Sequence, residues 1–106
     1  MKIFQIFDHS SEKDFATHLV QRLVKELPPS LMGIQSKVLS VNKITRLLER
    51  TYELAENFKK EKKLGFVKRA VLANHFKWTL REQKYPEDFI KMATEGLVVA
   101  LSKVGK

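Results

Sequence analysis

Apolar residues recur along most of the chain at the three- and four-residue spacing of amphipathic helices. This periodicity predicts helices over residues 12–27, 41–63, 66–83 and 86–104. Pro28 disfavours the helical conformation at Leu27 and is expected to end the first helix, whereas Gly65 is expected to end the second in a left-handed conformation. The pattern therefore favours a mainly α fold, a small four-helix bundle-like domain spanning residues 1–106.

The helix predicted over 66–83 differs from the other three because it carries two apolar stripes. One consists of Val67, Val71 and Trp78; the other consists of Leu72, Ala73, Phe76 and Leu80. Two stripes predict two contact surfaces, so this helix is expected to lie at the centre of the bundle or to contact a second chain as well. The spacing of Trp78 favours a place in the core.

Two shorter segments have the composition of strands. Residues 2–7 are rich in aromatic and β-branched side chains, and residues 34–41 alternate imperfectly between apolar and polar positions. If both are strands, they would pair in parallel around the first helix. The alternative is that 34–41 leads into the next helix and that 2–7 has no strand partner in the chain.

Charge is distributed unevenly over the sequence. The formal net charge is +8, and residues 59–84 contain nine basic residues against Glu61 and Glu82. The candidate binding residues surround the predicted turn at Gly65: Lys59, Lys60, Lys62, Lys63, Lys68 and Arg69. Lysines at the end of a helix also complement its dipole, but Lys68 and Arg69 lie near a helix start, where cations are disfavoured. A cationic junction of this kind favours a polyanionic partner.

Few residues point to catalysis or metal binding. The sequence has no cysteine, which excludes disulfides, zinc–thiolate sites and thiol nucleophiles. Asp14 and His18 have the spacing of two metal ligands, but no third ligand is near in sequence, so a solvated helix face is favoured. The segment Asp8–Ser11 would bind an anion only if 2–7 and 34–41 pair, and it lacks the glycines of a phosphate loop. We expect no catalytic residues, no metal and no cofactor.

The sequence favours a small basic accessory protein that binds nucleic acid through the junction at 59–69 by phosphate contacts without base readout. The alternative is a protein-interaction or dimerisation module that uses the two-faced third helix and the segment 2–7. Tyr85, beside Pro86 at a turn, is the aromatic residue most expected to be exposed. No apolar run reaches the length of a membrane span, and the N-terminus turns polar too soon for a secretory signal. We expect a cytoplasmic protein without a membrane role or a small-molecule substrate.

Overall fold

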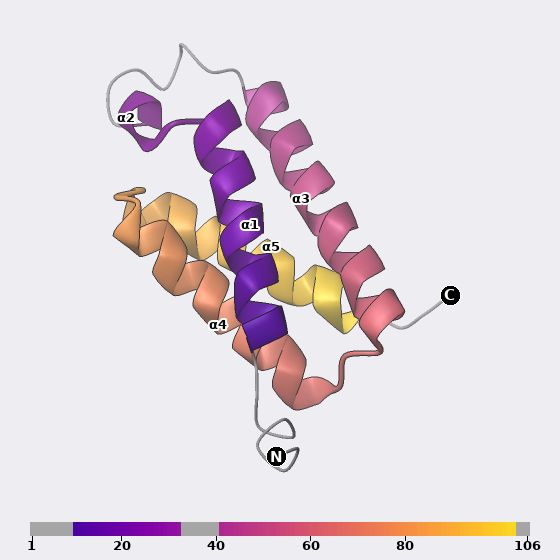
Figure 1. Cartoon of the computed structure of the whole chain (residues 1–106). Coiled ribbons are helices and arrows are strands. Elements are labelled where there is room, and N and C mark those ends of the chain that lie inside the picture. Colours follow the sequence, from indigo (N-terminus) through magenta and orange to yellow (C-terminus); the bar gives the residue numbers. More distant parts are fainter. Residues whose placement is uncertain (1–9, 33–40, 104–106) are drawn as a thin grey trace.

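The computed structural model describes residues 10–32 and 41–103, and in these ranges every regular element is an α-helix (Figure 1). The helices are α1 (Ser10–Glu26), α2 (Pro29–Met32), α3 (Val41–Lys62), α4 (Phe66–Glu82) and α5 (Glu87–Ser102). The four long helices confirm the predicted ones to within a few residues, and the single turn α2 was not predicted. The segments 2–7 and 34–40, proposed as strands, lie outside the described residues, and Val41 begins α3.

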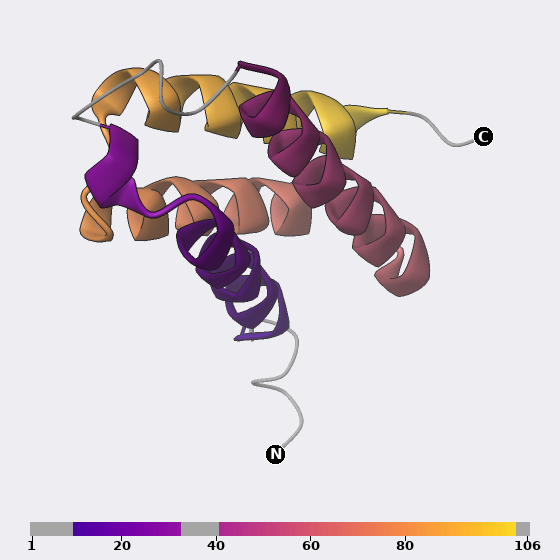
Figure 2. The same ribbon diagram turned by 90° about the horizontal axis from the view of Figure 1, so that it is seen from above.

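The helix pair α4 and α5 forms an antiparallel hairpin, and α1 and α3 cross this pair (Figures 1 and 2). α1 packs mainly along α4, while α5 packs against both α4 and α3. α1 and α3 meet only locally, where the rings of Phe15 and Phe58 stack with centroids 4.0 Å apart. The contacts are therefore bundle-like, with α4 and α5 as the elements that join the other two helices.

The core is formed by the apolar faces that the periodicity predicts. The largest fully buried side chains include Leu19 and Leu23 of α1, Phe76 of α4 and Leu97 of α5. A polar contact accompanies this packing between α1 and α4, because Thr17 Oγ1 lies 3.1 Å from His75 Nε2. Burial of apolar surface against neighbouring helices supplies most of the stability of such helices.

Only one of the two apolar stripes of α4 is covered within the described chain. Leu72, Ala73, Phe76 and Leu80 are buried, whereas Val67 is 63% exposed and Trp78 is 50% exposed. The expectation that Trp78 belongs to the core is therefore wrong. The reason is that α1 and α5 pack on adjacent parts of the same side of α4, which leaves the opposite side facing solvent.

The turn between α4 and α5 also differs from the expectation, because Tyr85 is buried rather than exposed. Lys84 adopts a left-handed conformation (φ 75°), and the amides of Lys84 and Tyr85 donate to the carbonyls of Arg81 and Leu80. This is the hydrogen-bond pattern of a Schellman motif, which turns the chain back toward the helix it has just left. The turn directs the Tyr85 ring inward, where its hydroxyl donates to the Leu27 carbonyl over 2.7 Å.

Candidate polyanion-binding site

The junction between α3 and α4 is a second Schellman turn. Lys63 takes the left-handed conformation (φ 53°), and the Leu64 amide donates to the Lys59 carbonyl over 3.1 Å. Leu64 is buried, which anchors the turn against the core. Gly65 was expected to be the left-handed residue. It is instead the extended N-cap of α4, with φ −81°.

Two of the six candidate cations are bound to the end of α5. Lys59 Nζ donates to the Lys103 carbonyl, and Arg69 donates to the Leu101 carbonyl over 3.0 Å. The last carbonyls of a helix have no partner within the helix and carry partial negative charge. Lys59 and Arg69 therefore join α3 and α4 to the C-terminus of α5, and sequence spacing alone did not indicate this structural role.

The other four candidates, Lys60, Lys62, Lys63 and Lys68, are exposed. Among the described residues, none of the four forms a salt bridge with a carboxylate. Glu56, the carboxylate on α3 one turn before them, is paired instead with Lys103 at 3.2 Å. The structure thus leaves four ammonium groups available to solvent on both sides of one turn, and we refer to them below as the junction lysines.

The junction lysines do not form a single row. Lys60 and Lys62 are two positions apart in α3, so their side chains leave the helix in directions about 200° apart. They surround the end of α3, while Lys68 lies in the first turn of α4. Such an arrangement suits a partner that wraps around the end of the helix better than one that lies flat along its side.

Two large apolar side chains lie within the same cationic segment. Phe66 and Val67, between Lys63 and Lys68, are 77% and 63% exposed. Exposed aromatic rings interleaved with lysines are typical of surfaces that bind single-stranded nucleic acid, because bases stack on rings while the cations contact phosphates. Phe66 was not among the residues singled out from the sequence, although its place beside Gly65 at a helix start was the available signal.

The remaining sequence candidates do not assemble into a site. Asp14 and His18 lie exposed on α1, and the described part of the chain holds no group of three His, Asp or Glu side chains that could bind a metal ion. Of the anion candidate Asp8–Ser11, only Ser10 and Ser11 fall within the described residues, at the start of α1. Across residues 10–32 and 41–103, no helix is long and apolar enough to span a bilayer.

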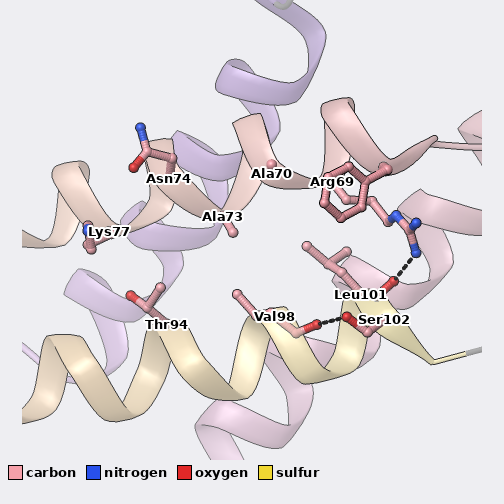
Figure 3. A pocket seen from close by; sticks show the side chains of 10 residues that line it. Arg69, Ala70, Ala73, Asn74, Lys77, Thr94, Val98, Leu101 and Ser102 are labelled. Atoms are coloured by element: carbon pink, nitrogen blue, oxygen red, sulfur yellow. Dashed lines mark hydrogen bonds between the residues drawn. The ribbon is translucent and has the colours of Figure 1, made fainter.

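A groove that none of the sequence candidates indicated lies between α4 and α5. Its volume is about 360 Å³. Figure 3 shows Ala70, Asn74 and Lys77 of α4 on one side, with Thr94 and Val98 of α5 on the other. Its signal in the sequence is the strip of α4 formed by Ala70, Asn74, Lys77 and Arg81, which share one side of the helix.

Comparison with protein-family models, curated proteins and solved structures found no match to this chain.

Proposed function

We propose that this chain is a small, non-enzymatic accessory protein that binds nucleic acid through the junction lysines. The observation that carries the proposal is the exposure of Lys60, Lys62, Lys63 and Lys68 without carboxylate partners among the described residues. Phosphate groups would provide the missing counter-charges, and the exposed ring of Phe66 would stack on an unpaired base.

Helix-dipole stabilisation by itself does not account for this cluster. Lys59 and Arg69 already neutralise the carbonyl end of α5, and Lys60 and Lys62 complement the end of α3. Lys68 lies in the first turn of α4, where the dipole disfavours a cation. A bound anion would offset that cost, and it would also reduce the mutual repulsion of the junction lysines.

The test is binding of fluorescent single-stranded RNA and duplex DNA by the full chain, measured at several salt concentrations. Each phosphate contact adds about 0.7 (single strand) to 0.9 (duplex) to the slope of log affinity against log salt. We expect K60Q/K62Q/K63Q/K68Q to lower that slope by about 3 and to weaken binding at low salt. A variant that binds as tightly as the natural chain would contradict the proposal.

A matched control separates the site from the overall charge. The variant K13Q/R22Q/K25Q/K91Q removes the same number of charges at exposed positions on α1 and α5. Both variants carry a formal net charge of +4 instead of +8. We expect the control to retain most of the affinity and the slope. Equal losses in the two variants would show a diffuse charge effect, and undetectable binding at low salt would exclude the function.

A further inference from the structure

We infer that an amphipathic helix of a partner protein docks in the groove between α4 and α5 and on the uncovered side of α4 beside it. Acidic residues flank the apolar stripe of this partner helix. This inference goes beyond the proposed nucleic-acid binding and concerns a neighbouring surface, which shares the Phe66 side chain with it. It starts from the uncovered stripe of α4, on which Val67 and Trp78 are more exposed than side chains of their size commonly are.

The groove has an apolar floor. Phe66, Ala70 and Ala73 line it from α4, and Val98 and Leu101 line it from α5. Phe66 is also the most exposed of the large apolar residues, and Val98 is 45% exposed. Phe66 and Ala70, which line the groove, are neighbours in α4 of Val67 and Val71, which belong to the uncovered stripe. The groove and the uncovered side of α4 are therefore continuous. An apolar groove of this form is the usual receptor for the apolar face of a helix.

The charge along the groove selects the partner. The charged side chains that line it are Lys77 and Arg69, and no carboxylate lines it. Arg69 keeps its net positive charge at the groove although one of its N–H groups donates to the Leu101 carbonyl. Arg81, on the same side of α4, is already paired with Glu87 at 2.9 Å, so the cations left for a partner are those that line the groove. Acidic side chains beside the apolar stripe of an incoming helix would complement these cations.

The same charges argue against a second copy of this chain as the occupant. In a twofold-symmetric dimer, identical patches face each other. Such a dimer on this surface would bring Arg69 and Lys77 of one chain close to the same cations of the other. Like charges brought together in an interface are unfavourable, so a foreign helix of opposite charge fits the surface better.

A buried hydroxyl in the groove also lacks a partner. Thr94 Oγ1 is shielded from solvent, and no described residue hydrogen-bonds to it. Threonine in a helix commonly donates to the carbonyl four residues earlier, as Thr51 and Thr79 do here. Thr94 instead points from α5 toward α4 (Figure 3). Because this oxygen is shielded from solvent, a polar side chain of the docked helix would satisfy it only after the Thr94 side chain rotates toward the groove.

The test uses a phage-displayed library of helical peptides with a fixed leucine stripe at positions i, i+3, i+4 and i+7. Glu, Lys or Gln is allowed at each position beside the stripe. Selection on the full chain is expected to enrich Glu over Lys at those positions. Enrichment of Lys, no charge preference, or no enrichment at all would overturn the inference.

A pair of variants locates the binding site of the selected peptides. A70E/V98E places carboxylates in the groove at exposed positions, and we expect it to weaken binding of a selected peptide at least tenfold. M92E/V99E introduces the same change at exposed positions of α5 that do not line the groove, and it is expected to bind as the natural chain does. Circular dichroism checks that both variants fold. Equal binding by both variants would overturn the inference.

Two further measurements test the other occupants. Concentration-dependent dimerisation in sedimentation equilibrium, abolished by A70E/V98E but not by M92E/V99E, would assign the groove to a second copy and overturn the inference. Loss of RNA affinity in A70E/V98E but not in M92E/V99E would assign the groove to nucleic acid and would also overturn the inference. The two proposals share Phe66, but the junction lysines do not line the groove. Failure of one is therefore distinguished from failure of the other by K60Q/K62Q/K63Q/K68Q, which is expected to weaken RNA binding and to leave peptide binding unchanged.

Discussion

The phenol ring of Tyr52 occupies the space above Gly96 that any larger residue would need. A Cβ atom built at Gly96 would lie 2.2 Å from Tyr52 Oη, a distance that real Cβ contacts do not reach. The Tyr52 hydroxyl donates to the Ala93 carbonyl over 2.9 Å, which holds the ring in this place. The glycine in the middle of α5 thus admits a side chain that links α3 to α5.

We therefore expect Gly96→Ala to lower the free energy of unfolding by about 1–3 kcal/mol, the range typical of overpacking. The effect is expected to reverse in a Tyr52→Ala background, where the space is free and alanine stabilises the helix by up to about 1 kcal/mol over glycine. Urea unfolding of the four chains of this double-mutant cycle provides the measurement. Equal destabilisation in both backgrounds would contradict the proposed contact.

Tyr85 is expected to make stability depend on alkaline pH. Burial raises the pKa of Tyr85 from 10.0 to about 12, so the folded chain keeps the phenol protonated where the unfolded chain loses the proton. The resulting stabilisation is complete below pH 10 and is lost as the pH rises through 12; for a shift of this size it amounts to about 2–3 kcal/mol.

The variant Tyr85→Phe isolates this contribution. Near pH 8 it is expected to be about 1 kcal/mol less stable than the natural chain, because the hydrogen bond to the Leu27 carbonyl is lost. Between pH 10 and 12 the difference is expected to shrink and then reverse, because only the natural chain must keep the phenol at position 85 neutral. Burial also raises the pKa of Tyr52 to about 12, but that phenol is common to both chains and cancels in the difference. Urea unfolding across this pH range is the measurement, and a constant difference would contradict the assignment to Tyr85.

Lys84→Gly is expected to stabilise the protein by up to about 1 kcal/mol. Lys84 holds a left-handed backbone conformation that disfavours every residue with a Cβ atom, and glycine removes that cost. Lys91→Gly is the matched control, since it removes the same side chain at an exposed position inside α5. The control is expected to be destabilised by about 1 kcal/mol. Thermal unfolding of both variants compares them, and destabilisation by Lys84→Gly would argue against the left-handed turn.

The two stripes of α4 are expected to contribute very different amounts to the free energy of unfolding. Phe76 is fully buried, so Phe76→Ala should cost about 3–5 kcal/mol. Trp78 is half exposed, so Trp78→Ala should cost much less, on the order of 1 kcal/mol, despite the larger side chain. Chemical denaturation of the two variants provides the comparison. A large loss in Trp78→Ala would mean that its stripe is buried in solution, in a dimer or otherwise.

The four long helices could be predicted because their information is local. Leu19 and Leu23 of α1, or Ala93 and Leu97 of α5, share a face whatever the rest of the chain does, since the helical repeat alone aligns them. The positive charge near Gly65 is local information as well, because it follows from the basic and acidic residues of one short segment. Residues 2–7 and 34–40 lie outside the described ranges, so the predicted strand pairing stays a prediction.

The partners of those faces required the tertiary structure. Tyr85 and Leu27 are 58 positions apart, and Arg69 and Leu101 are 32 apart. No local pattern shows that the first pair buries a tyrosine or that the second removes Arg69 from the set of free cations. The same holds for α4, whose two stripes are equally apolar in the sequence although only one is covered.

Residue spacing and charge along the chain are enough to place the helices, the side chains that share a face and the concentration of positive charge. The packing of the helices sets which stripe of α4 remains uncovered, which cations are bound to carbonyls of α5 and which four remain available. The physical reason is that side-chain spacing acts within one helix, whereas burial and hydrogen bonding depend on which helices cross, and that is settled by contacts between residues far apart in the chain.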